Sequence, residues 1–277
     1  KLYKLSFFGE SASLAESIFY NPNFELKAIF CEKNKINNDL LTFSFLRNIP
    51  IFKVENNLDL LERLSEIKLD FVIMCGFGII LNKKTLNYIK VFNIHPGKLP
   101  NYKGRHPTFF ATINGDKSIF FTLHEVIVEI DKGKIIDEVE MPYYFWQNEY
   151  DIQKFLIVAF NQLMGSLILY IENKINSRNN SGGKYYPRVE KKNKILKTDY
   201  PASKLLNIIR AQAPYGGGIF LYNKKEYLVS RAEVQIIDKN YRNKKKILIT
   251  NDKPIGIIID KNYFLRFTEI VRLKTDK

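Results

Sequence analysis

Residues that bind metals or form disulfides are scarce in this sequence. It contains two cysteines and three histidines among 277 residues. Cys31 and Cys75 lie in apolar stretches that we expect to form buried strands, and their spacing fits neither a metal-ligand set nor a disulfide framework. These absences predict no metal site, exclude a disulfide-stabilised secreted domain and favour a reducing compartment.

Long apolar runs are also missing. The longest, residues 71–81, has about half of the ~20 residues that a membrane-spanning helix needs, and it contains two glycines. The first residues, KLYKLSFFGE, run directly into strand-like sequence without the apolar core and cleavage site of a secretory signal. We therefore expect a cytoplasmic protein that does not associate with membranes.

Acidic residues are outnumbered, because 29 acidic against 43 basic residues give a formal net charge of +14. Such a charge can indicate nucleic-acid binding, since lysine and arginine neutralise phosphates. Only ten of the basic residues are arginine, however, and the lysines are spread along a chain that is rich in asparagine. This distribution is typical of a solvated surface rather than a dedicated RNA-binding face, and it suits an anionic small substrate equally well.

Strand-length apolar runs alternate with amphipathic stretches over the first two thirds of the chain. The predicted strands are residues 2–8, 26–30, 71–75, 91–94, 120–126 and 134–139, and the predicted helices are residues 11–19, 38–47, 57–65, 107–113 and 149–176. This alternation is typical of a sheet with helices on both faces. We therefore predict an α/β fold with a doubly wound, mostly parallel sheet.

The periodicity ends at residues 177–199, which are polar and contain a Gly-Gly pair and many lysines. After a short helix at residues 202–211 come apolar segments separated by turn residues, namely GIFLY, EYLVS, VQII, KILIT, IGIII and YFLRF. The sequence thus predicts a first domain over residues 1–180, a linker over 181–199 and a small β-rich C-terminal domain over 200–277.

Polar side chains follow two predicted strands at their carboxyl ends, where open parallel sheets bind ligands. Asn93 and His95 point the same way, because side chains alternate along an extended chain, and Asp131 lies in an Asp-Lys-Gly turn after a later strand. Each residue alone has an ordinary explanation as a loop cap or turn former. Their combination, with the prolines and glycines of FNIHPGKLPNYKGRHP, predicts a catalytic site.

This constellation resembles the signature of the 10-formyltetrahydrofolate-dependent formyltransferases, and the resemblance covers most of residues 1–175. The matching residues are Asn93-Ile94-His95-Pro96, Leu99-Pro100, Tyr102, Gly104, Pro107, Thr122 and Asp131-x-Gly133, and upstream MCGFGIILNKKTL resembles the folate-site strand and loop of that family. The segment after the first strand, FFGESAS, lacks the glycine-rich dinucleotide fingerprint. The implied cosubstrate is therefore 10-formyltetrahydrofolate rather than a dinucleotide, with no metal.

The resemblance implies an enzyme and gives each residue a task. Formyl transfer to a primary amine needs stabilisation of a tetrahedral oxyanion, to which Asn93 can donate, and movement of a proton, which suits His95. Asp131 would orient the imidazole, and either His95 or Asp131 could be the base. Asp131 and a mostly apolar segment would also contact the pterin; the residues of this segment are Phe77, Gly78, Ile79, Ile80 and Leu81.

Some positions depart from the family pattern. Phe120 stands where the family usually has glycine, and Val128, Glu129 and Lys132 replace smaller or differently charged residues before the Asp-x-Gly turn. These changes leave the catalytic triplet intact but concern the loop that meets substrate and pterin.

The acceptor that we favour is the amine of a nucleotide-linked amino deoxysugar, as used in the biosynthesis of cell-surface glycans such as lipopolysaccharide. The tRNA enzymes carry a longer basic insertion after the second strand, whereas this chain has only FCEKNKINNDLLTF. Substrate contacts are expected from Lys98, Tyr102, Arg105 and His106. The cationic groups among them, on Lys98, Arg105 and His106, could neutralise a diphosphate. Methionyl-tRNA is the alternative acceptor, and glycinamide ribonucleotide a more distant one.

A non-catalytic folate-binding module is a further alternative, because one fold can serve several functions. It is disfavoured by the presence of the whole triplet, of which a binding module could lose any member. We also expect a homodimer, formed through an edge strand of the β-rich domain.

Overall fold

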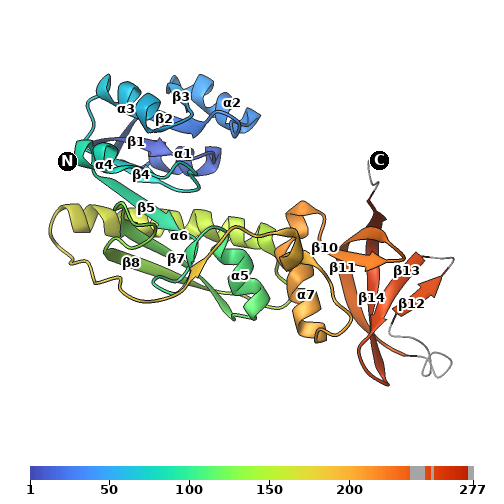
Figure 1. Ribbon diagram of the computed structural model, residues 1–277. Helices are drawn as coiled ribbons and strands as arrows, with labels where there is room; N and C mark the ends of the chain where they lie inside the picture. The colour runs from blue at the N-terminus through green and yellow to red at the C-terminus, as the bar shows by residue number, and fades with distance from the viewer. Residues whose placement is uncertain (238–246, 251–252, 274–277) are drawn as a thin grey trace. The chain divides into compact units, whose positions relative to one another are not determined.

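The computed structural model describes residues 1–237, 247–250 and 253–273, and it confirms the predicted fold class (Figure 1). A seven-stranded sheet has the order β3-β2-β1-β4-β5-β7-β8, and a separate five-stranded sheet lies in the C-terminal part of the chain. The strands of the first sheet are β1 (Tyr3–Phe8), β2 (Phe24–Glu32), β3 (Ile51–Val54), β4 (Phe71–Met74), β5 (Val91–His95), β7 (Ser118–Glu125) and β8 (Ile135–Pro142).

The helices of this part of the chain are α1 (Ala12–Phe19), α2 (Asn38–Arg47), α3 (Asn57–Ser65), α4 (Lys83–Tyr88), α5 (Pro107–Asn114) and α6 (Glu149–Ile171). The first four begin at polar caps, since side-chain oxygens of Ser11, Asn37, Asn56 and Asn82 accept hydrogen bonds from the first turn of each helix. The asparagine-rich sequence thus supplies good N-caps, which satisfy backbone N–H groups that would otherwise lack partners.

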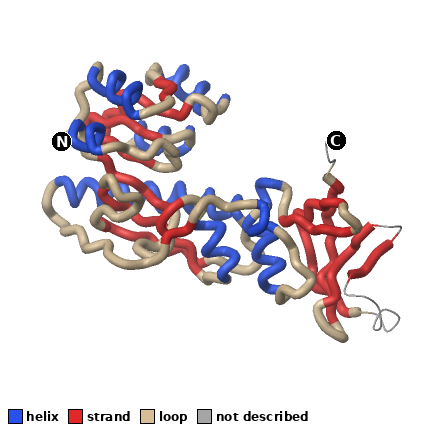
Figure 2. Tube along the Cα trace, viewed as in Figure 1, coloured by secondary structure: helices blue, strands red, loops and turns tan. Residues whose placement is uncertain are grey.

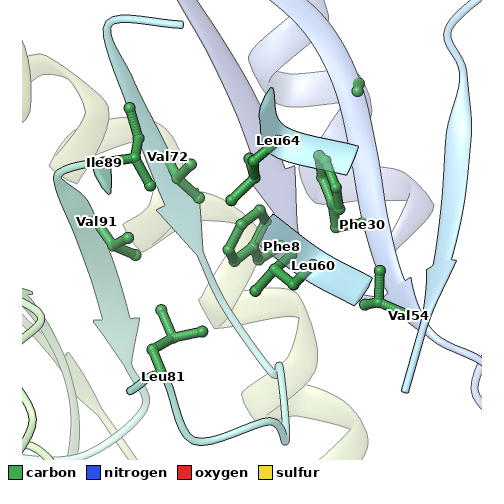
Figure 3. Packing of buried hydrophobic residues seen from close by; sticks show 10 residues of the cluster. Phe8, Phe30, Val54, Leu60, Leu64, Val72, Leu81, Ile89 and Val91 are labelled. Carbon is green, nitrogen blue, oxygen red and sulfur yellow. The ribbon is translucent and has the colours of Figure 1, made fainter. Parts of the chain in front are cut away.

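Side chains alternate between the two faces of the sheet along each strand, and both faces are apolar. On one face Phe8, Phe30 and Val72 pack against Leu60 and Leu64 of α3 (Figure 3). Phe7 points to the other face, where its ring meets Phe160 of α6 edge-on at 6.4 Å between centroids. Burial on both faces explains why most of these strands read as apolar runs.

Two short elements of the sheet region do not appear among the sequence predictions. β3 is an edge strand of four residues after Pro50, too short and too mixed in polarity to show a period. α4 has six residues and depends on its Asn82 cap rather than on an apolar stripe. Packing against neighbouring elements supports both, and in α4 it adds to the cap.

Helix α6 ends at Ile171, five residues earlier than predicted, where Asn173 adopts a left-handed conformation. By length and composition this helix could cross a membrane, with a mean hydropathy of 1.6 over its most apolar window. A helix that packs along a sheet has the same composition, and six residues of α6 are buried here, namely Ile152, Ala159, Phe160, Leu163, Met164 and Leu167.

The C-terminal sheet, whose strands are drawn in red in Figure 2, is antiparallel and has the order β10-β11-β14-β13-β12. Its strands are β10 (Gly218–Tyr222), β11 (Lys225–Ile236), β12 (Ile247–Thr250), β13 (Lys253–Ile258) and β14 (Tyr263–Arg272). Its core contains Leu205, Ile208 and Ile209 of α7 (Ala202–Ala211). The predicted segments EYLVS and VQII are parts of one strand, β11, and the first residue of KILIT, Lys246, lies outside the described residues.

The chain divides into two compact units whose segments interleave in sequence. The first comprises Lys1–Gly104, Phe120–Met141 and Lys154–Tyr185, and the second comprises Arg105–Ile119, Pro142–Gln153 and Tyr186–Lys277. Residues 181–185 of the predicted linker therefore pack with the sheet, and residues 186–199 pack with the second unit.

Glu149 in the second unit generates a stability prediction. Its Oε1 accepts a hydrogen bond from the Thr108 hydroxyl at 3.2 Å, and burial raises the pKa of the carboxyl to about 7. The unfolded chain loses this proton near pH 4.5, so stability present below that pH is lost as pH rises towards 7. Glu149→Gln should stabilise the protein at pH 8 by on the order of 1–3 kcal/mol, measured by urea unfolding.

The control for this experiment is Glu62→Gln, an exposed position on α3. It should change neither the stability at pH 8 nor the difference in stability between pH 5 and pH 8. An equal pH dependence in wild type and Glu149→Gln would contradict the prediction.

Candidate active site

The predicted triplet comes together at one edge of the seven-stranded sheet. Asn93 and His95 end β5 and are both buried. β5 pairs in parallel with β4 and in antiparallel with β7, which sets Asn93 opposite Met74 on one side and opposite His124 on the other. The strands therefore fix the two side chains from both neighbours.

The His95 ring lies between two acceptors. Its Nε2 is 2.6 Å from the main-chain oxygen of Tyr102, and its Nδ1 is 3.7 Å from Asp131 Oδ2. Because a carbonyl oxygen can only accept, Nε2 carries the hydrogen. The nitrogen that faces Asp131 is thus the one that can gain a proton.

The Asp131 carboxylate is held from the opposite side of the site. Its Oδ2 accepts the Gly104 N–H at 2.7 Å, and its side chain is 11% exposed. The residue has φ of +51°, a left-handed conformation that aspartate tolerates better than most residues. The Asp-Lys-Gly turn after β7 therefore delivers the carboxylate to the histidines.

A second histidine, His124, completes the cluster and is absent from the sequence prediction. Its Nδ1 donates to the Glu125 main-chain oxygen at 2.7 Å, so its Nε2 can accept from Asn93 Nδ2 at 3.0 Å. Burial lowers the pKa of His124 to about 4, which keeps the ring in the neutral form that this arrangement requires. Asp131 Oδ1 lies 3.6 Å from the same nitrogen.

The sequence holds a signal for His124 in its spacing from Thr122. The two residues alternate on one side of β7, and the antiparallel register places them opposite Asn93 and His95. Thr122 donates its hydroxyl hydrogen to Gly97 O at 2.7 Å and so holds the loop that follows His95. That loop contains a cis peptide bond between Leu99 and Pro100.

The segment predicted to meet the pterin leaves the sheet beside Asn93, directly after β4. Phe77 packs on Phe8 with ring centroids 5.1 Å apart, Ile79 also packs on the core, Leu81 is buried and Ile80 is exposed. The Gly78 N–H donates to Glu32 Oε1 at 2.7 Å, and a Cβ at this position would lie 2.7 Å from the same oxygen. A side chain here would therefore displace the Glu32 carboxylate and break its hydrogen bond to this segment.

The residues predicted to bind the acceptor fall into both units. In the first, Lys98 is exposed with its ammonium 4.1 Å from the centre of the Phe120 ring, and Tyr102 contributes its main-chain oxygen to His95. In the second, Arg105 and His106 are exposed, and His106 Nδ1 accepts the Val189 N–H at 3.1 Å. The Lys98 contact gives Phe120, one departure from the family pattern, a physical role as a cation–π partner.

No group of three or more His, Cys, Asp or Glu side chains that could hold a metal ion occurs among residues 1–237, 247–250 and 253–273. The two cysteines are unpaired and buried, and burial raises their pKa values, to about 11 for Cys31 and about 12 for Cys75. Neither thiol is therefore suited to act as a nucleophile.

Residues 33–153, which include the whole cluster, match the formyl transferase family. The segment that carries the cluster therefore belongs to this family. The protein is a formyltransferase, as the resemblance in its sequence predicts. The matched segment runs from the end of β2 into the start of α6 and so spans β4, β5 and the Asp131 turn.

Relatives extend the likeness over nearly the whole formyltransferase. It is 23% identical to methionyl-tRNA formyltransferase of Mycoplasma genitalium over 292 aligned residues, 97% of this chain and 91% of the relative. It shares its fold with an N-formyltransferase from Helicobacter canadensis that was solved in complex with folinic acid and dTDP-3-aminofucose. The TM-score is 0.71 at 19% identity, and the match covers 96% of this chain and 99% of the Helicobacter canadensis chain. HypX from Aquifex aeolicus gives TM-score 0.66 at 14% identity, over 96% of this chain and 45% of HypX.

The His124 contact generates a kinetic prediction for the formyltransferase. His124→Phe keeps a ring but removes the acceptor that orients the Asn93 amide, so kcat should fall roughly 10- to 100-fold. His124→Gln offers an oxygen near the same place and should recover part of the loss. Steady-state formyl transfer with both variants checks this, and a normal kcat for His124→Phe would show that Asn93 needs no such support.

Proposed function

We propose that this formyltransferase moves a formyl group from 10-formyltetrahydrofolate to the primary amine of a nucleotide-linked amino deoxysugar, for the synthesis of cell-surface glycans. The observation that carries the reaction is the cluster of buried Asn93 and His95 with the nearly buried Asp131 at the carboxyl ends of β4 and β5. Such a cluster offers a neutral donor, a base and a carboxylate within one site.

In the proposed reaction the acceptor amine attacks the formyl carbon, and the carbonyl oxygen becomes an oxyanion. One N–H of the Asn93 amide is used by His124, which leaves the other to donate to that oxyanion. The tetrahedral intermediate then breaks its bond to the folate nitrogen, which gains a proton while the amine loses one.

We assign the base to His95 Nδ1. The Tyr102 oxygen fixes the hydrogen on Nε2, so the neutral ring presents a lone pair at Nδ1. Asp131 Oδ2, 3.7 Å away, stabilises the positive charge that the ring acquires when it takes the proton from the amine. The ring can afterwards return this proton to the leaving folate nitrogen.

The folate site that we propose consists of Asp131 and the segment of Phe77, Gly78, Ile79, Ile80 and Leu81. An apolar wall that begins beside Asn93 suits a flat heterocycle whose reactive group must reach the cluster. The Gly78 N–H and the Ile80 carbonyl are engaged by Glu32 and Asn57, so neighbouring main-chain groups of the segment would read the pterin edge. Bound folate would supply the activated formyl group.

The link between β2 and α2 supports a sugar acceptor over a tRNA. It is short, running from Glu32 to Asn38, and its two lysines form ion pairs, Lys33 with Glu55 at 2.5 Å and Lys35 with Glu32 at 2.7 Å. Paired lysines on a short link offer little to an acceptor stem. The exposed side chains of Lys98, Arg105 and His106, with Tyr102, are our candidates for contacts with the sugar nucleotide.

Methionyl-tRNA is the second candidate acceptor. It is favoured by the likeness to the Mycoplasma genitalium enzyme, which covers nearly the full length of both chains. A formal charge of +14 is compatible with it. The Helicobacter canadensis structure, which contains an amino-sugar nucleotide, supports the first candidate.

A cytoplasmic homodimer is part of the proposal, because sugar nucleotides and reduced folates are soluble cytoplasmic substrates. The edge strand β12 of the C-terminal sheet offers main-chain groups for pairing with a second copy, whereas β10 is bridged by Ile195 at Ile219. Sedimentation of the protein as a monomer at micromolar concentration would remove the dimer from the proposal.

The acceptor is decided by an assay with 10-formyltetrahydrofolate, a panel of dTDP- and UDP-linked amino sugars, and methionyl-tRNA in parallel. We expect release of tetrahydrofolate and a product heavier by one formyl group with a sugar only. Turnover of tRNA alone would transfer the proposal to the second candidate. Folate binding without turnover of any acceptor would favour a binding module.

Substitutions test the assignment of the cluster. Asn93→Ala, His95→Ala and Asp131→Ala should each lower kcat on the order of 100-fold or more, because each removes a group that acts in the transition state. Lys132→Ala, next to Asp131 but exposed, is the matched control and should keep near-normal kcat. Equal effects at 131 and 132 would mean that the carboxylate has no special role.

A further inference from the structure

Residues 178–185, named here the strap, lie in sequence beyond the segment that matches the family, yet they pack in the first unit. The strap begins as an antiparallel bridge, in which Arg178 N–H donates to Ile135 O at 2.7 Å and Ile135 N–H donates to Arg178 O at 3.0 Å. Its polar, glycine-containing sequence resembles a linker, but it makes specific main-chain hydrogen bonds to the first unit.

Asn180 joins the strap to the Asp131 turn. Its Nδ2 donates to Asp131 O at 2.9 Å and to Gly133 O at 2.8 Å, so one amide spans the turn. The turn also packs closely on β7, because a Cβ on Gly133 would lie only 1.8 Å from Glu125 O. Asn180 therefore holds the backbone on both sides of Lys132 and stabilises the left-handed Asp131.

The far end of the strap is tied to the loop that follows His95. Lys103 is buried, its Nζ donates to Gly182 O, and its N–H donates to Lys184 O at 3.1 Å. Gly183, with φ of +74°, lies so close to Pro100 that a Cβ would stand 1.9 Å from its carbonyl oxygen. The strap thus bridges the two segments that meet where Gly104 N–H donates to Asp131.

Burial of the Asn180 side chain costs free energy that packing alone does not explain. Its side chain is 5% exposed, and its Oδ1 is buried without a hydrogen-bond partner among the described residues. A buried acceptor of this kind costs free energy, which an apolar residue would avoid. The two donors directed at the Asp131 turn are what the amide contributes in return.

We propose that Asn180 is a positioning residue for formyl transfer, which acts by holding the Asp131 turn so that the carboxylate stays beside His95. The proposal rests on the proposed function, because it takes Asp131 as a member of the catalytic cluster. Small displacements of a catalytic group reduce rate strongly, whereas binding of an acceptor depends on other contacts. The strap is then part of the active site rather than a connection between domains.

The test measures kcat and KM for the acceptor in Asn180→Ala, with Asn176→Ala, an exposed asparagine shortly before the strap, as the matched control. We expect kcat to fall about 10-fold or more with acceptor KM within about 2-fold, and no change in the control. If Asn180→Ala does not fold, Asn180→Asp replaces it, because it keeps the shape but cannot donate to either carbonyl.

A double-mutant cycle separates positioning from a purely structural role. If Asn180 acts through Asp131, then Asn180→Ala should lower kcat no further in an Asp131→Ala background. A full additional loss there, or a normal kcat in folded Asn180→Ala or Asn180→Asp, would overturn the proposal while an active wild type keeps the proposed function. A wild type that is silent with every acceptor would overturn both.

Discussion

The antiparallel pairing of β5 with β7 is the constraint on which the rest of the site depends. Its register places His124 opposite Asn93 and Thr122 opposite His95. One strand thereby orients the Asn93 amide, which we propose as the oxyanion donor, and through Thr122 it also holds Gly97 in the loop that follows His95. A slip of one residue would turn all four side chains to the other face of the sheet and would separate the proposed donor and base. The proposed reaction thus depends on strand register before it depends on any single residue.

Charge at the site is organised around one carboxylate. Asp131 lies within 3.7 Å of His95 and 3.6 Å of His124, yet burial keeps His124 neutral. In the proposed reaction the positive charge formed during proton transfer therefore resides on the His95 ring, and the carboxylate stands beside it. Hydrogen bonds from Gly104 to the side chain and from Asn180 to the backbone keep this geometry without adding a competing cation.

The identity of the acceptor depends on the surface around the cluster rather than on the cluster itself. Formyl transfer to a sugar amine and to a methionyl amine needs the same chemical groups. The cluster therefore identifies the chemistry, whereas the loops select the substrate. On the link between β2 and α2 the lysines are paired with glutamates of the same unit. The net charge of +14 attracts anions in general and does not by itself select one acceptor.

The sequence by itself determined the α/β class, the triplet of Asn93, His95 and Asp131 and the family, because these follow from hydrophobic period and from short motifs whose residues are near one another in the chain. Tertiary structure alone decided that His124 supports Asn93 and that Asn180 holds the Asp131 turn, since strand register and contacts between distant segments leave no local pattern. The edge strand β3 and the capped helix α4 escaped prediction for the same reason, because packing against neighbours stabilises them more than their own periodicity does. Residues 178–185 show the limit most clearly: polarity and glycines predict a linker, and only their backbone partners reveal a part of the site.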